Sequence, residues 1–270
     1  MHCNYGTVSW RLRAYVHRPG AFRHKYTAER SVTVVTCPTD DDIEETENII
    51  IERHWDHQLQ YLIVVSGRSF CIGGTLPVTF TLLPLSKVKV YRVAVYLEGK
   101  LTLISFFSAS HRKLISTEER TEYYINMRKL ARADPLSRTE LLCIRNEGRD
   151  ASHVLPLESD DPDVFYESPL FAALSSQLEN NAEVSELVSS FMGPGPWSFH
   201  LDLKLPDSCS MIKPTNKNKR ANMVVSHVLK IILRIERGDD RFLDQGRRGK
   251  LFDIVVQMPV HILSVSLLFL

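Results

Sequence analysis

The chain has 270 residues, enough for one large β domain or for two domains of ordinary size. Its 33 Lys and Arg residues nearly balance its 32 Asp and Glu residues, so no overall field attracts a polyanion and we expect no nucleic-acid partner. Apolar residues make up 44% of the chain, which together with the small net charge excludes a wholly disordered protein.

Cysteine spacing excludes two kinds of small stabilised domain. The five cysteines are odd in number and lie far apart, with no Cys-x-x-Cys pair, whereas disulfide frameworks and zinc ribbons need close, paired spacing. We therefore expect free thiols in a reducing compartment, the cytoplasm, and no cofactor or metal. Residues 1–6 lack the apolar segment of a secretory signal.

The first predicted strand is residues 10–17, in which Leu12, Ala14 and Val16 alternate with charged or polar residues. An acidic run then follows Pro38, and we interpret it as a solvated linker. This run divides the chain into a remnant of an N-terminal domain at 1–40, a linker at 41–57 and a main β domain at 58–265.

Residues 69–86 carry no charge over about the length of a bilayer span. They contain Gly73-Gly74 and two prolines, however, and Val78, Phe80 and Leu82 alternate with threonines. This pattern predicts a turn that leads into a β-strand, not a spanning helix.

The segment 87–97 changes phase in the middle. Val88 and Val90 share one parity, whereas Val93 and Val95 share the other. One extra residue in a strand produces this shift, so we expect a β-bulge near Tyr91.

Helix signals are concentrated in one insertion near 168–192. Ser168-Pro169 is typical of an N-cap and first turn, and a second helix is expected from Asn181 until Gly193-Pro194 stops it. A further helix around 123–130 has weaker support, and the polar stretch 146–167 is expected to be an exposed loop.

Three long strands are predicted after this insertion, each with strict alternation. In the second, His227 occupies the apolar parity, which favours a hydrogen-bonded core histidine over a catalytic base. In the third, Pro259 lies on the outward parity, as suits an edge strand or a strand end, and the alternation favours a strand over a membrane anchor for most of 254–270. The strands are residues 197–205, 225–236 and 252–262.

Signatures of catalysis are missing from the sequence. It has no Gly-x-Ser-x-Gly, Walker or Gly-x-Gly-x-x-Gly motif, and His54 and His57 have no further ligand at a suitable spacing. We therefore expect no enzyme and assign no catalytic, cofactor-binding or metal-binding residue.

A basic cluster lies in the loop between the first two of these long strands. Each basic residue near an anionic membrane surface contributes about 1 kcal/mol of attraction, so this loop is a candidate contact for an acidic lipid or a phosphorylated partner. A solvated turn is the alternative. The cluster consists of Lys213, Lys217, Lys219 and Arg220.

An ordered series of segments resembles the fungal arrestin-related trafficking adaptors, also called alpha-arrestins, over nearly the whole chain. The series starts with residues 10–20 and 46–55, which look like the end of an arrestin N-terminal domain and the passage into the second domain. It continues with segments that resemble strands of the arrestin C-terminal domain, namely 73–80, 87–90, 195–197, 216–218, 225–230 and 250–257. The resemblance implies an immunoglobulin-like β-sandwich with only the last strands of the first sandwich retained.

The resemblance also implies a function. Members of this family bind plasma-membrane transporters and bring them a HECT-type ubiquitin ligase, which triggers endocytosis, so we expect a cytoplasmic protein peripheral to the plasma membrane or endosomes. The ligase docks on Pro-Pro-x-Tyr or Leu-Pro-x-Tyr motifs. This chain has no Pro-Pro pair and no tyrosine at that offset after its Leu-Pro pairs, which puts ligase docking by this chain in doubt. Two alternatives stay open, an arrestin-like sorting-coat subunit without ligase recruitment and a β-sandwich enzyme or lectin with a site built from loops.

Overall fold

The computed structural model describes residues 2–3, 6–7, 9–17, 26–32, 34, 47–103, 135–150, 152–178, 180–208, 211–216, 223–238 and 249–264. The weakly predicted helix at 123–130 lies outside these residues, as do Asp40 to Glu45 of the acidic run.

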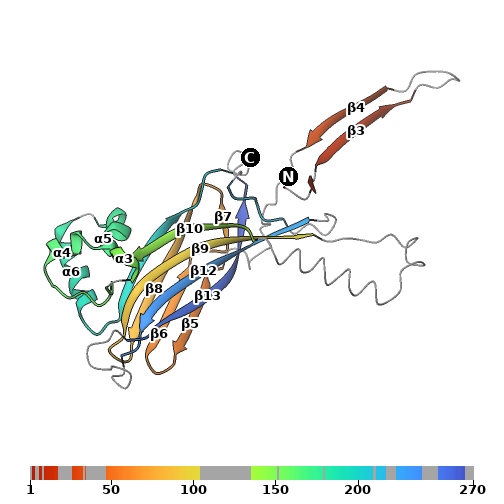
Figure 1. The fold of residues 1–270 in the computed structure, drawn as a ribbon. Helices are drawn as coiled ribbons and strands as arrows, with labels where there is room; N and C mark the ends of the chain where they lie inside the picture. Colours follow the sequence, from red (N-terminus) through yellow and green to blue (C-terminus); the bar gives the residue numbers. More distant parts are fainter. Residues whose placement is uncertain are drawn as a thin grey trace, which may run out of the picture.

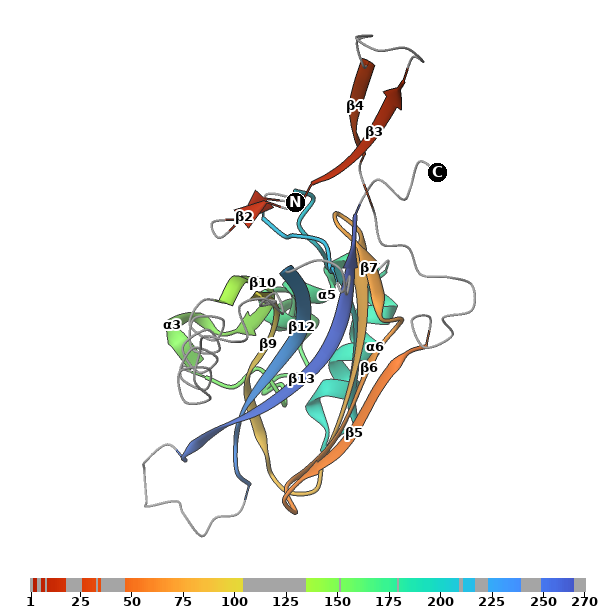
Figure 2. The same ribbon diagram turned by 90° about the vertical axis from the view of Figure 1, so that its right-hand side faces the viewer.

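Two β-sheets make up the main body (Figures 1 and 2). The strands are antiparallel except where β7 pairs with the end of β13. The all-β sandwich predicted from the sequence is confirmed. One sheet has the order β10 (Pro135–Arg145), β9 (Lys89–Leu103), β12 (Met223–Glu236), β13 (Leu251–Leu263) and β7 (Ser69–Cys71). The other has the order β11 (Trp197–Lys204), β8 (Thr75–Pro84), β6 (Leu59–Val65) and β5 (Ile49–Trp55).

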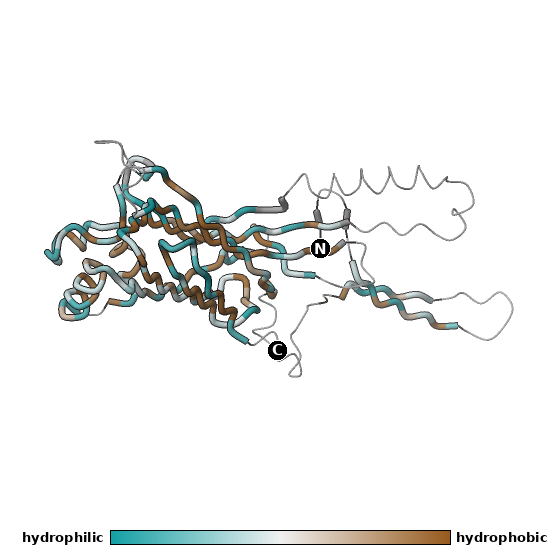
Figure 3. The backbone as a smooth tube through the Cα atoms, turned by 90° about the horizontal axis from the view of Figure 1, so that it is seen from below, coloured by the Kyte–Doolittle hydropathy of each residue, from teal (hydrophilic) through white to brown (hydrophobic). Residues whose placement is uncertain are grey.

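The alternating residues of both sheets form one hydrophobic core. Phe80 of β8 and Phe199 of β11 stack across their strand pair with ring centroids 5.0 Å apart. Burying a large apolar side chain of this kind contributes about 1.5–3 kcal/mol. In Figure 3 the hydrophobic segments run along the strands of the two sheets. The alternation read from the sequence is therefore the pattern that fills the space between the sheets.

The β-bulge expected near Tyr91 is confirmed. Arg92 pairs with Arg234 of β12, but Val90 pairs with Ile235, so Tyr91 is the extra residue. Its hydroxyl donates a hydrogen bond of 2.5 Å to Oε2 of Glu236. The bulge lets Val90 and Val93 both point into the core although they are three residues apart.

The two predicted helices of the insertion are confirmed at their starts. Oγ of Ser168 accepts from the Phe171 amide and caps α5 (Pro169–Leu174), which the 3₁₀ turn η2 (Ser175–Gln177) follows. Asn180 caps α6 (Asn181–Met192), which ends before Gly193. Side chains of α6 at helical spacing join the core, and Trp197 Nε1 donates to the Gly193 carbonyl at 3.0 Å.

The expectation of an exposed loop at 146–167 is wrong. This stretch contains α3 (Glu147–Asp150) and α4 (Pro162–Tyr166), and Val154, Leu155 and Phe165 are buried. The backbone of Leu155 bridges to Val90, whose amide donates to the Leu155 carbonyl at 2.8 Å. The chain is polar in this stretch, but its buried apolar side chains and the backbone pair with Val90 hold it against the sandwich.

An N-terminal ribbon lies away from the two sheets (Figures 1 and 2). It consists of β3 (Trp10–Val16) paired with β4 (Tyr26–Val32), with the short pair β1 (His2–Cys3) and β2 (Gly6–Thr7) before it. Its described side chains are exposed, including Trp10 and Leu12. The division into 1–40, 41–57 and 58–265 stays a prediction, but residues 49–55, placed in the linker, form edge strand β5 of the second sheet.

The uncharged stretches at 69–86 and at 254–264 form strands, as expected. β7 borders β13 only at residues 261–263, so among the described residues Pro259 faces no strand on the side opposite β12. In the described part of the chain, no helix combines the length and the apolar character needed to cross a bilayer.

Candidate functional site

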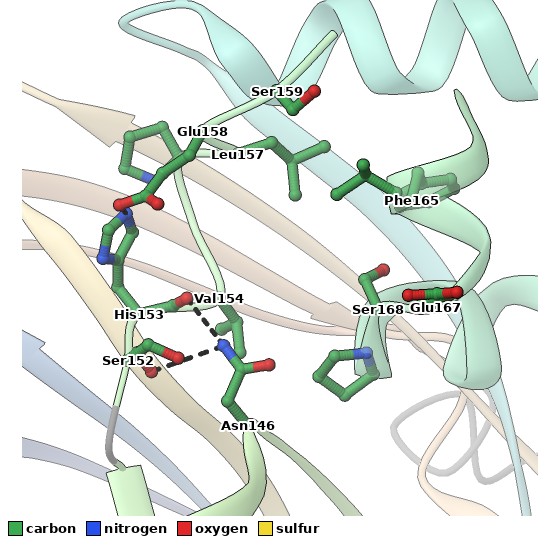
Figure 4. Close-up of a pocket in the computed structure, with 13 residues that line it drawn as sticks. Asn146, Ser152, His153, Val154, Leu157, Glu158, Ser159, Phe165, Glu167 and Ser168 are labelled. Carbon is green, nitrogen blue, oxygen red and sulfur yellow. Dashed lines mark hydrogen bonds and ion pairs between the residues drawn. The ribbon is translucent and has the colours of Figure 1, made fainter. Parts of the chain in front are cut away.

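A pocket of about 300 Å³ lies where the segment after β10 meets α4 and the start of α5 (Figure 4). Its floor is apolar and includes Val154, Leu157 and Phe165, which belong to the core or pack against it. Because Val154 and Phe165 are almost fully buried, their packing in the core of the sandwich fixes the position of the pocket floor.

The polar groups of the pocket are held by local hydrogen bonds. Nδ2 of Asn146 donates to the His153 carbonyl at 2.8 Å and, more weakly, to the Ser152 carbonyl at 3.5 Å (Figure 4). The hydroxyl oxygens of Ser159 and Ser168 accept from the Asp161 and Phe171 amides. These hydroxyls cap backbone turns instead of pairing with a base, which favours a binding pocket over a reaction centre.

His153 connects the pocket to the β-bulge. Its ring contacts that of Tyr91 edge-on, with centroids 6.1 Å apart, and its Nε2 lies 3.4 Å from Oε1 of Glu158. Burial lowers the pKa of His153, and the positive charge of Lys89 lowers it further, against smaller opposing effects of Glu158 and Glu236. His153 is therefore neutral at pH 7, so this contact does not give Glu158 a cationic partner.

The rim of the pocket is acidic. Glu158 and Glu167 line it with exposed carboxylates, and Asp160, Asp161 and Asp163 are exposed in the segment between them. Residues 158–186 contain eight Asp and Glu and no Lys or Arg. Our sequence reasoning did not predict this site, although this stretch without a basic residue is a local signal that could have marked it.

The predicted basic cluster is described only in part. Lys213 is half-buried, whereas Lys217, Lys219 and Arg220 lie outside the described residues. The loop is anchored at Thr215, because Thr215 and Ile262 exchange backbone and side-chain hydrogen bonds and Thr215 Oγ1 lies 2.9 Å from Nδ1 of His227. His227 is thus a hydrogen-bonded core residue, as predicted.

The two histidines weighed as metal ligands lie in different local settings. His54 is exposed on β5, and His57 lies in the turn that follows. Within the described residues, no three His, Cys, Asp or Glu side chains come together as a metal site would require.

One segment of the sandwich matches a known domain family. Residues 55–143 match the family model described as the C-terminal domain of arrestin (or S-antigen), and this segment carries five strands, β6 to β10, of the two sheets. The resemblance read from the sequence is confirmed.

The relatives that the comparisons found are fungal. The chain is 26% identical over 260 residues to arrestin-related trafficking adapter 3 of Saccharomyces cerevisiae, and the aligned region covers 96% of this chain and 21% of that protein. It is 28% identical over 265 residues to a putative arrestin-related trafficking adapter of Schizosaccharomyces pombe, and the aligned region covers 96% of this chain and 32% of the relative. The chain therefore spans between about a fifth and a third of the length of these relatives.

Proposed function

We propose that the protein is an arrestin-like trafficking adaptor that binds plasma-membrane transporters and links them to ubiquitin-ligase-dependent endocytosis. The observation that carries this proposal is the similarity over 96% of the chain to proteins named trafficking adapters, on a sandwich of the arrestin C-terminal class. In this role the sheets and loops supply contact surfaces, and the protein acts at the cytoplasmic face of the plasma membrane or of endosomes.

The basic loop is the part of this proposal that concerns the membrane. Lys213 begins a cluster of four basic residues that is completed by Lys217, Lys219 and Arg220. Hydrogen bonds that join Thr215 to His227 and Ile262 fix the loop to the sandwich at that residue, between Lys213 and the rest of the cluster. A basic loop on a fixed base can contact acidic head groups or a phosphorylated partner, at about 1 kcal/mol per basic residue near an anionic surface.

Sedimentation with vesicles tests the loop. We expect the wild-type chain to sediment with vesicles that contain phosphatidylserine, and we expect the variant with all four basic residues changed to Glu to lose most of this binding. A single charge reversal outside the loop, Lys204→Glu on the exposed face of β11, serves as a control. Equal binding of the wild type and the fourfold variant would contradict the loop's role.

Deletion of the gene tests the adaptor function. After a nutrient shift, we expect cells without the gene to internalise at least one nutrient transporter more slowly than normal cells, and the wild-type gene to restore the rate. Affinity capture distinguishes the route. A captured ubiquitin ligase supports the ligase link, whereas capture of sorting-coat subunits without a ligase would favour the coat-subunit alternative.

A further inference from the structure

The pocket at α4 and α5 combines an apolar floor with an acidic rim. Phe165 and Val154 are 1% and 4% exposed, so the floor is a fixed part of the core. The side chain of Glu158, by contrast, is 82% exposed, and Glu167 is also exposed. A ligand that fits both must carry apolar atoms next to a positive charge.

Lysine and arginine side chains have this character, because they pack an aliphatic stem against apolar surface while the charged head stays at the rim. The volume of about 300 Å³ is at the lower end of ligand pockets, which suits one or two side chains and not a folded domain. Among the described residues, no Lys or Arg lines the pocket, and the rim carboxylate of Glu158 faces a histidine that burial keeps neutral.

We propose that this pocket binds a Lys- or Arg-bearing peptide segment of a partner protein, with the basic side chain between Glu158 and Glu167 and its stem on Phe165 and Leu157. This proposal deepens the proposed function. It rests on that function in one respect, which is that the partner is the cytosolic tail of a transporter. The charge complementarity is local, because the chain as a whole has a formal net charge of +1.

Fluorescence anisotropy of a labelled peptide tests the pocket directly. The probe is a fluorescein-labelled nonapeptide with two arginines and one lysine between leucines, compared with the same peptide carrying glutamine at the three basic positions. We expect the full chain to bind the basic peptide at least about tenfold more tightly than the glutamine peptide, since one charge-assisted contact contributes about that factor. We also expect this preference to shrink as salt rises.

The variant E158Q/E167Q keeps the shape of the rim and removes both charges. We expect it to bind the basic peptide about tenfold more weakly than the wild type does. A control with the same change in charge is D202N/D207N, at exposed positions that do not line the pocket, and it should bind as the wild type does. Far-ultraviolet circular dichroism and the unfolding midpoint show that each variant is folded.

Three results would overturn the proposal. The first is equal binding of the basic and the glutamine peptide by the wild type, and the second is an equal loss of peptide binding in both double variants. The third is a wild-type chain that forms dimers in sedimentation while E158Q/E167Q does not, which would make a second copy of the chain the occupant of the pocket.

Transporter uptake in cells separates this proposal from the adaptor function. If deletion of the gene slows internalisation but E158Q/E167Q restores it fully, the pocket proposal fails and the adaptor function stands. If the deletion has no effect on any transporter while the purified chain prefers the basic peptide, the adaptor function fails and the pocket proposal stands.

Discussion

Thr215 and His227 form a buried pair at the base of the basic loop, with Oγ1 of Thr215 2.9 Å from Nδ1 of His227. Nε2 of His227 is buried and finds no hydrogen-bond partner within the part of the chain that the structure describes. Burial, together with a smaller effect of the nearby His261, lowers the pKa of His227 to about 4. The loop is therefore held at Thr215 by a histidine that the fold keeps neutral.

This histidine predicts how stability depends on pH. Between about pH 6.5 and pH 4 the unfolded chain binds a proton at residue 227 that the folded chain does not bind, so acid favours unfolding. The stability that neutral His227 contributes is complete above pH 6.5 and declines as the pH falls towards 4, by about 3 kcal/mol in total. Urea unfolding at pH 7, 5.5 and 4.5 measures this decline.

The variant His227→Gln should show a weaker decline over the same range because glutamine does not titrate. His200→Gln, on the outer face of β11, is the control and should retain the wild-type dependence. An identical pH dependence for the wild type and His227→Gln would contradict the assignment.

Arg234 joins the helical region to the five-stranded sheet. Its guanidinium binds Asp253 of β13 through two hydrogen bonds of 2.7 and 2.8 Å and reaches Asp150 at the end of α3 at 2.6 Å. The side chain of Asp150 is only 5% exposed, so Arg234→Met would leave a buried carboxylate without its cation. We expect the free energy of unfolding to fall by about 2–4 kcal/mol in chemical denaturation.

Arg138→Met is the comparison for this prediction. Arg138 lies 3.6 Å from Glu98 and is 49% exposed, and an exposed pair of this kind contributes about 1 kcal/mol or less. If the two variants lose the same free energy of unfolding, the buried contact between Arg234 and Asp150 contributes no more than an exposed ion pair, and the prediction is wrong.

Gly238 marks a close approach between the end of β12 and the turn before β9. A Cβ at this position would overlap the backbone of Lys87, and the Gly238 amide donates to Oε1 of Gln58 at 2.9 Å. Gly238→Ala should therefore destabilise the protein by about 1–3 kcal/mol, because backbone must move to make room. Gly193→Ala, where an added Cβ meets nothing within 4 Å, should cost clearly less in the same thermal unfolding measurement.

The bulge at Tyr91 predicts the effect of a deletion. Removing Tyr91 would shift the parity of Val88 and Val90 against the rest of β9, so one set of valines would leave the core. We expect the deletion variant to lose the folded sandwich, whereas Tyr91→Phe folds and loses the bond to Glu236, at about 1 kcal/mol. A deletion variant with a native-like near-ultraviolet spectrum would show that the register tolerates the shift.

Several features of the fold could be predicted because their causes are local. The phase change around Tyr91 is visible in four valines. Ser168 stands directly before its helix, as predicted, and Asn180 stands one residue before the predicted helix start at Asn181. Segment 146–167 could not be predicted in this way. Its order comes from Leu155 pairing with Val90, which is 65 positions earlier in the chain, and no local pattern encodes that contact.

The sequence by itself determined the sheet faces and the bulge, because side chains on a strand alternate and residues two apart share an environment. The resemblance to the arrestin family was also present in the sequence, in an ordered series of segments. Only the tertiary structure decided that edge strand β5 belongs to the sandwich and that an acidic-rimmed pocket lies at α4 and α5. Those features depend on segments that meet in space after the core has formed, and the burial of Val154 and Phe165 against the sheets is what brings the carboxylates of Glu158 and Glu167 to one rim.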